Sequence, residues 1–113
     1  MHRGEIYLVD LDGNIGSEQN GVRPALIVQN NIGNACSSTT IICPLTSQVK
    51  TNASTHVELT PEDCGILKDS IVLCEQVRVI DKTRLIRKVG DVTNKKKIDD
   101  VNRKLMLSIG LGV

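Results

Sequence analysis

The sequence predicts a mainly β protein of the α+β class, in which a small barrel-like antiparallel sheet carries one helix at its C-terminal end. Short apolar or alternating runs, separated by turn residues, recur along the chain as far as Val92. One long stretch with apolar residues at helical spacing follows, from Lys95 to about Leu111. No linker, repeat or low-complexity segment divides the chain, so we expect a single domain over residues 1–113.

The runs with the length and composition of strands are bounded by Gly, Asn, Asp or Pro. Asn30–Asn34 is predicted to be a turn, and Asp81–Leu85 a tight turn. Thr60 and Pro61 predict one helical turn that ends at Gly65, because Thr is a good N-cap and Pro suits the first helical position. The predicted strands are Glu5–Asp10, Ala25–Gln29, Thr39–Leu45, Thr55–Leu59, Asp69–Leu73, Glu75–Ile80 and Arg87–Val92.

The C-terminal helix is predicted from its ends and from one apolar stripe. Thr93 or Asn94 provides the N-cap, and Gly110 follows the last periodic residue. We expect the stripe to pack in the core or against a second subunit. Its members are Ile98, Val101, Leu105 and Ile109.

The charge is small in total and uneven along the chain. The net charge is +1, but residues 1–81 hold five Lys/Arg against ten Asp/Glu, whereas residues 82–113 hold nine against three. This asymmetry permits a nucleic acid or an acidic partner without requiring one. Tyr7 is the only aromatic residue, so any base contacts should rely on hydrogen bonds rather than stacking.

Several classes of protein are disfavoured by what the sequence lacks. No stretch approaches the ~20 apolar residues of a membrane span, and the N-terminus has no signal-peptide core, so we expect a cytoplasmic protein without membrane contact. The four cysteines form no CxxC pair or Cys/His cluster, which predicts no metal site. Cys43 and Cys74 should be reduced core thiols. There is no P-loop or GxGxxG motif, so we expect no cofactor.

The segment from Gly16 to Gln29, GSEQNGVRPALIVQ, carries the clearest functional pattern. A polar loop runs into an apolar strand, and Arg23 stands between them, just before Pro24. A residue that precedes proline favours extended geometry, which places a guanidinium at the mouth of a buried strand. Such a group suits phosphate because it is always charged and offers a rigid donor fork. The same local pattern also fits an ordinary strand end with a surface arginine.

A second polar side chain should lie close to this arginine. If the second and third strands pair as an antiparallel hairpin, the start of one lies beside the end of the other. That pairing brings Arg23 and Thr46 to one rim of the barrel, with Gln48 and the Ser17–Gln19 loop nearby. A guanidinium and a hydroxyl can together hold a phosphate that gains charge in a transition state.

In its motifs and in their order along the chain, the sequence resembles the MazF/PemK-type toxins, which are the mRNA interferases of toxin–antitoxin systems. The motifs that carry the resemblance are RGEIYLVDL, GSEQNGVRPALIVQN, PLTSQ, THVEL and EQVRVIDKTRL. The resemblance implies an SH3-like (CcdB-like) β-barrel with a C-terminal helix, and a homodimer that binds single-stranded mRNA across the subunit interface. It also implies metal-independent, sequence-specific cleavage by attack of the 2′-hydroxyl, leaving a 2′,3′-cyclic phosphate and a 5′-hydroxyl.

The resemblance further assigns roles to single residues. Arg23 and Thr46 match the catalytic pair, and Glu18 lies in the matching active-site loop. Arginine is effectively always protonated, so Arg23 is a poor general base. The sequence does not identify the group that takes the 2′-hydroxyl proton: Glu18 is one candidate and Arg23 itself is another. A cognate MazE-like antitoxin should cover the RNA site with an acidic, otherwise disordered C-terminal tail. The expected RNA-binding residues are Ser17, Gln19, Ser47, Gln48, Gln76 and Arg78.

Two other functions are compatible with the same fold. One is a gyrase-binding toxin similar to CcdB. Those proteins lack the Arg-Pro pair at the start of the strand, and they act through a C-terminus that carries an aromatic residue. This chain has the Arg-Pro pair and no aromatic residue at its C-terminus. The other is a catalytically inactive partner protein, against which the intact Arg23 and Thr46 argue. If RNA is cut, base specificity should come from the loops Asp12–Gly21, Val49–Ser54 and Gly65–Ser70.

Overall fold

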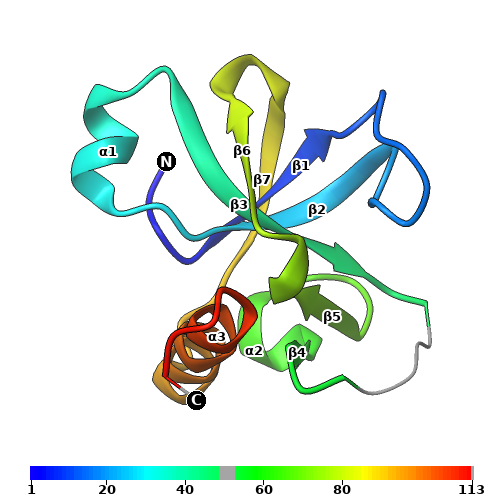
Figure 1. Cartoon of the computed structure of the whole chain (residues 1–113), viewed down its shortest axis with the longest axis vertical. Coiled ribbons are helices and arrows are strands. Elements are labelled where there is room, and N and C mark those ends of the chain that lie inside the picture. The colour runs from blue at the N-terminus through cyan, green and yellow to red at the C-terminus, as the bar shows by residue number, and fades with distance from the viewer. Residues whose placement is uncertain (49–52, 113) are drawn as a thin grey trace.

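A strongly curved antiparallel sheet and a C-terminal helix make up the computed structural model, which describes residues 1–48 and 53–112 (Figure 1). The strand order is β4-β5-β3-β2-β1-β7, and β6 pairs with β3. The strands are β1 (Glu5–Asp10), β2 (Val22–Ile27), β3 (Thr39–Thr46), β4 (His56–Leu59), β5 (Ser70–Leu73), β6 (Arg78–Asp81) and β7 (Leu85–Asp91). The helices are α1 (Asn31–Cys36), α2 (Pro61–Cys64) and α3 (Lys95–Ser108), with 3₁₀ turns η1 (Cys74–Gln76) and η2 (Lys82–Arg84).

This architecture confirms the predicted mainly β fold with a terminal helix, although the barrel is open. Within the described parts of the chain, no pairing joins β6 to β7, which are linked only through η2. Strand β3 takes part in both layers, because its first half pairs with β6 and its last two residues pair with β5. Pro44 lies where β3 changes partner, so its missing N–H removes no ladder hydrogen bond there.

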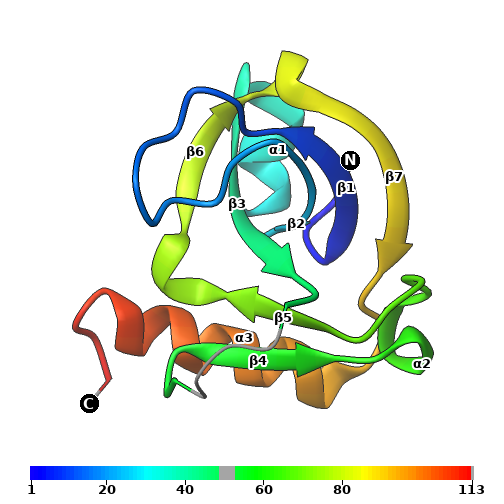
Figure 2. The same cartoon turned by 90° about the vertical axis from the view of Figure 1, so that its right-hand side faces the viewer.

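The sheet has a buried cluster on each of its two faces. Val9 and Ala25 face the inside of the curve, where they pack with Ile27. Ile6 and Leu26 face the other side, where a second layer of β4, β5 and α3 covers them (Figure 2). All five side chains are fully buried. Burial on both faces explains why β1 and β2 read as nearly continuous apolar runs.

Helix α1 replaces the turn that was predicted at Asn30–Asn34. Asn30 caps the helix by accepting a hydrogen bond from the Gly33 N–H at 2.8 Å. The buried Asn34 side chain donates to the Gln29 carbonyl at 3.0 Å and accepts from the Thr40 hydroxyl at 2.8 Å. A six-residue helix is unstable by itself, so these tertiary hydrogen bonds decide its conformation.

The start of β2 also differs from the prediction. The strand begins at Val22 rather than Ala25 and includes Pro24. Proline is tolerated because β2 pairs with β3 only over Ala25–Ile27, so the ladder on that side has ended before Pro24.

The two predicted helices are present, with one correction. Helix α2 begins after Thr60 with Pro61 at its first position and ends at Gly65, as expected. Helix α3 is capped by Asn94 but ends at Ser108, so Ile109 is the C-cap and is 61% exposed. Ile109 is therefore not in the core of the subunit, and its packing against a second subunit stays a prediction, whereas the other three members pack in or against the core. Among the described residues, no helix has the length and apolar character needed to cross a membrane.

The cysteine prediction agrees with the structure. Cys43 and Cys74 are free thiols with no exposed surface. The Cys74 thiol, hydrogen-bonded to that of Cys43, and burial together raise the pKa of Cys43. Both residues belong to the cluster between the sheet and the second layer.

Candidate active site

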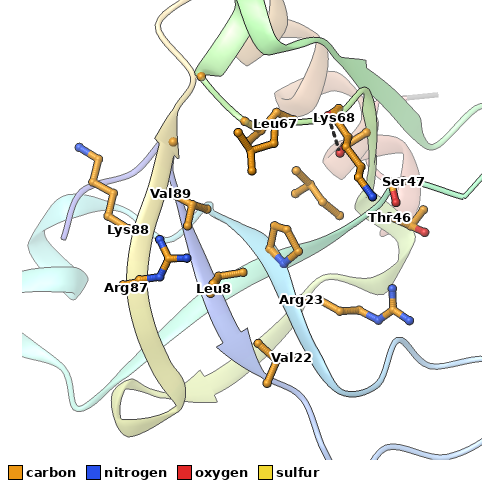
Figure 3. Close-up of a pocket in the computed structure, with 16 residues that line it drawn as sticks. Leu8, Val22, Arg23, Thr46, Ser47, Leu67, Lys68, Arg87, Lys88 and Val89 are labelled. Atoms are coloured by element: carbon orange, nitrogen blue, oxygen red, sulfur yellow. Dashed lines mark hydrogen bonds between the residues drawn. The ribbon is translucent and has the colours of Figure 1, made fainter.

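The central feature of the site is that Arg23 lies beside Thr46. Strands β2 and β3 are antiparallel with Ala25 opposite Pro44, and continuing this register by two residues places Arg23 opposite Thr46. The predicted antiparallel pairing is thereby confirmed. Both residues line one cavity and lie beside each other at one end of it (Figure 3).

Hydrogen bonds orient both groups and leave their outer donors available. The Arg23 Nε donates to the Asn20 carbonyl at 2.6 Å, which directs the terminal guanidinium nitrogens outward. Thr46 is almost fully buried, and its hydroxyl oxygen accepts from the Gln48 N–H at 3.3 Å. Among the described residues the Thr46 hydroxyl donates no hydrogen bond, so its proton can be donated to a ligand. Two donors from adjacent strands can thus bind the oxygens of one phosphate.

The cavity next to this pair has a volume of about 760 Å³ and is cationic. Its described lining includes four basic residues and no Asp or Glu. An anion would therefore meet no opposing carboxylate there. The basic residues are Arg23, Lys68, Arg87 and Lys88, and the apolar ones are Leu8, Val22, Pro24, Leu45, Ile66, Leu67 and Val89.

Lys88 differs from the other three cations because its charge is already neutralised. Its Nζ lies 2.6 Å from Glu5 Oε2 and 3.6 Å from Asp91 Oδ2. The hydrogen bond to Glu5 and the two negative charges raise the pKa of Lys88. Burial alone would raise the pKa of Glu5, but the hydrogen bonds from Lys88 and the His2 backbone outweigh it and lower that pKa.

The loop between β1 and β2 is fastened to the rest of the protein by side chains of η1 and β6. The Gln76 Oε1 accepts from the Gln19 N–H at 2.9 Å, and its Nε2 donates to the Ser17 carbonyl at 3.3 Å. The Arg78 guanidinium donates to Asn14 Oδ1 at 2.6 Å. Gln76 and Arg78, which were predicted to contact RNA, therefore both hold this loop in the structure.

The remaining predicted site residues fall into two neighbouring groups. Glu18 and the largely buried Gln19 line a second, smaller cavity of about 320 Å³ together with Gln76 and Arg78. Glu18 is exposed there and accepts from the Ile15 N–H at 3.4 Å, so the structure does not bring it into the cavity of Arg23 and Thr46.

Only part of the predicted RNA-contacting segment lies at the larger cavity. Ser47 lines it, whereas the exposed Ser17 and Gln48 line neither cavity. Residues 49–52 of the predicted specificity loop lie outside the described residues.

The sequence analysis did not single out Lys68 and Arg87, two basic residues of the larger cavity that have no ion pair among the described residues. Lys68 lies in the 65–70 loop, which the sequence analysis assigned to specificity without singling out this side chain. Arg87 reaches the site because β7 pairs with β1, with Arg87 opposite Leu8. A strand pairing of this kind leaves no local signal in the sequence.

Fold and site together define a class: a small open-barrel α+β protein that presents an arginine and a buried hydroxyl beside a cationic cleft. The model of the family described as "PemK-like, MazF-like toxin of type II toxin-antitoxin system" matches residues 2–109. The chain belongs to this family, which confirms the resemblance found in the sequence.

Two curated relatives match almost the whole chain. Endoribonuclease EndoA of Bacillus subtilis (strain 168) is 43% identical over 112 residues, which cover 98% of this chain and 96% of that protein. Endoribonuclease MazF of Staphylococcus saprophyticus is 42% identical over 112 residues, which cover 98% and 92%.

Solved structures agree with the fold. An endoribonuclease in complex with its cognate antitoxin, from a mycobacterial species, superposes with a TM-score of 0.83 at 26% identity, covering 100% of this chain and 98% of that one. MazF from Deinococcus radiodurans gives a TM-score of 0.84 at 23% identity, covering 98% and 97%. At that lower identity, the second match supports the fold alone.

Proposed function

We propose that this protein is the toxin of a type II toxin–antitoxin system and that it cleaves single-stranded mRNA at a short sequence without a metal ion. The observation that carries the proposal is that Arg23 and Thr46 lie together beside a cleft whose described lining is cationic. Family membership and the two relatives named as endoribonucleases support the same reaction class.

In the proposed reaction the 2′-oxygen of the substrate attacks the adjacent phosphorus, and the bond from phosphorus to the 5′-oxygen breaks. The products are a 2′,3′-cyclic phosphate and a 5′-hydroxyl. Arg23 stabilises the charge that builds on the phosphorane and donates a proton to the leaving 5′-oxygen, while the Thr46 hydroxyl donates to a non-bridging oxygen. Two donors already held in place need little reorganisation during the reaction.

The group that takes the 2′-hydroxyl proton is either Glu18 or Arg23. Glu18 has the chemistry of a general base, but in the free protein its carboxylate lies at the neighbouring cavity. RNA binding would have to turn it toward Arg23. Arg23 needs no such movement, but it would have to lose a proton that arginine normally keeps.

The proposal includes the partners of the toxin. RNA binds a homodimer across the subunit interface, and the cognate antitoxin covers the RNA site with an acidic tail. The cationic cleft supports the binding of RNA and of the acidic tail, since it attracts a phosphate backbone and a run of carboxylates alike. A mycobacterial endoribonuclease has been solved with its own cognate antitoxin. We place this toxin in the cytoplasm, where mRNA is found.

The test is incubation of the purified protein with a long single-stranded RNA in EDTA, followed by mapping of the cut ends. We expect cuts at one short motif that leave 5′-hydroxyl ends. Arg23→Ala and Thr46→Ala should each slow cleavage by about 10²–10³-fold, the usual loss of one transition-state donor. Circular dichroism and sedimentation control for folding and oligomeric state.

The outcomes separate the alternatives. A folded wild-type protein that cuts no RNA contradicts the proposal, and a gyrase inhibition assay then tests the CcdB-like function. A folded Arg23→Ala protein that cuts at the wild-type rate removes Arg23 from catalysis. Glu18→Gln identifies the base. If Glu18 takes the proton, the cleavage rate of this variant no longer falls at acidic pH. If Arg23 takes the proton, the variant keeps that fall in rate.

A further inference from the structure

We infer that the uncovered part of the sheet face beside Arg23 is a track for the backbone of single-stranded RNA, in which Arg87 and Lys68 bind phosphates. The inference rests on the proposed function and adds to it the path that the RNA takes away from the cleavage site.

The floor of the track follows from the strand register. Leu8 of β1 pairs with Pro24 of β2 on one side and with Arg87 of β7 on the other. Directly opposed residues of a sheet point to the same face, so these three side chains form one row across three strands. The parallel row of Ile6 and Leu26 is fully buried under the second layer. The track is therefore the part of this sheet face that the second layer leaves uncovered.

The track borders the predicted catalytic pair at the ends of β2 and β3. Arg23 is opposite Val9 and so belongs to the other face of the sheet, but Arg23 and Thr46 both line the cavity. Adjacent strands lie about 4.8 Å apart, so Arg87 is displaced from β2 by roughly 10 Å across the sheet. Figure 3 shows Arg87 beside Leu8 at one end of the cavity, and Lys68 beside Ser47 and Thr46 at the other. A short segment of RNA with one phosphate at Thr46 would therefore pass over Leu8 toward Arg87.

The charges of the track are uncompensated. Unlike Lys88, neither Lys68 nor Arg87 forms an ion pair with a carboxylate in the described parts of the chain. Both side chains are exposed, so each can meet a phosphate without first breaking a salt bridge. Lys88 is opposite Tyr7 rather than Leu8, and its side chain points away from the cavity (Figure 3).

The apolar surface at the edge of the track suits unstacked bases. Val22 is 57% exposed and Leu67 is 96% exposed, and both line the cavity. Because the chain has one aromatic residue in total, aliphatic side chains of this kind are the available hydrophobic surface for a base. The same patch does not suit a two-fold interface between copies, since the patch would face itself and bring like charges together.

The test compares a charge removal in the track with one outside it. Arg87→Gln and Lys96→Gln each remove one positive charge from an exposed side chain, but Lys96, in the first turn of α3, lies outside the cavity. Cleavage of a short single-stranded RNA that contains the mapped motif is measured at several salt concentrations. Binding of the same RNA is measured by fluorescence anisotropy in a Thr46→Ala background.

We expect Arg87→Gln to raise KM and the dissociation constant about five- to tenfold and to leave kcat within about twofold, because a phosphate contact contributes binding rather than chemistry. The slope of log affinity against log salt should fall by about 0.7, the value for one lost contact to a single strand. Lys68→Gln should behave in the same way, and Lys96→Gln like the wild type.

Three results would overturn the track. In the first, Arg87→Gln has the wild-type KM and salt slope while the wild-type protein cuts normally. In the second, kcat falls with an unchanged KM. In the third, the oligomeric state of Arg87→Gln changes in sedimentation, which would make this face an interface between copies. A wild-type protein that neither binds nor cuts the RNA instead refutes the proposed function, and the track with it.

Discussion

Gln76 shows how single side chains organise this site. Its amide binds the backbone of Ser17 and Gln19, and the next residue, Asn20, accepts the hydrogen bond from the Arg23 guanidinium. Gln76 therefore acts on Arg23 through the loop, without lying in the cavity of Arg23 and Thr46. Such supporting hydrogen bonds matter because a catalytic group that is displaced by a fraction of an ångström loses much of its effect.

Replacement of Gln76 by methionine, which is of similar length but cannot form these hydrogen bonds, should loosen the loop. We expect the Gln19 amide hydrogen to exchange roughly tenfold faster in the absence of RNA, since one hydrogen bond contributes about 1–1.5 kcal/mol. Cleavage should slow mainly through kcat. Hydrogen exchange of the free protein measures the effect, with Gln48→Met as the matched control.

Unchanged exchange at Gln19, combined with a raised KM, would contradict the positioning role. It would instead support a direct contact between Gln76 and RNA, the role expected from the sequence.

At the scale of secondary structure, Asp63 joins the starts of two helices. Its carboxylate accepts from the Thr60 N–H at 2.8 Å, which completes the capping box of α2. It also accepts from the side chain of Asn94, the N-cap of α3, at 3.3 Å and lies 4.0 Å from the Lys97 ammonium. The hydrogen bond from the Thr60 backbone is the main cause that lowers the pKa of Asp63.

This lowered pKa predicts a pH-dependent contribution to stability. Because the folded-state pKa of Asp63 lies below its unfolded value, the stabilisation is fully present above the unfolded pKa of about 3.9 and is lost as the pH falls through the folded value. Asp63→Asn should reduce the free energy of unfolding by about 0.5–1 kcal/mol at pH 7. The difference from the wild type should shrink toward pH 3.

Urea denaturation at pH 7, 5 and 3 measures this difference. Asp69→Asn is the control, because Asp69 is exposed and has no side-chain hydrogen bond or ion pair to the described residues. A deficit of Asp63→Asn that is the same at every pH would show that the charge of Asp63 does not contribute.

At the scale of the whole molecule, one buried cluster connects the curved sheet to the second layer. The cluster contains Ile6 and Leu26 from the sheet, Val57 and Val72 from β4 and β5, and Val101 from α3. Neither layer can unfold without exposing the apolar surface of the other. We therefore expect the chain to unfold as a single cooperative unit, in keeping with the predicted single domain.

Two independent probes can test this cooperativity. Tyr7 is the only aromatic residue and packs against the cluster inside the curve, so its fluorescence reports on β1 and the barrel. Helix α3, the longest of the described helices, dominates the circular dichroism signal at helical wavelengths. The two urea transitions should have the same midpoint and slope. Separate midpoints would show that the layers unfold independently.

The sequence by itself determined the features that arise from interactions over a few residues. Proline geometry placed Arg23 at the entrance of a strand, the Thr60–Pro61 pair began α2, and Asn94 began α3. Alternating and apolar runs indicated the strands, and the ordered motifs indicated the toxin family. Each of these signals is local, because caps, turns and side-chain alternation act within one or two turns of chain.

Only the tertiary structure decided which distant residues meet. Arg87 enters the cleft through the pairing of β7 with β1, and Gln76 holds a loop 57 residues away in the sequence. Helix α1 forms because the Asn34 side chain is hydrogen-bonded to Gln29, which follows β2, and to Thr40 of β3. Contacts of this kind depend on strand order and on burial, which are properties of the assembled sheet and have no periodic signature in the chain.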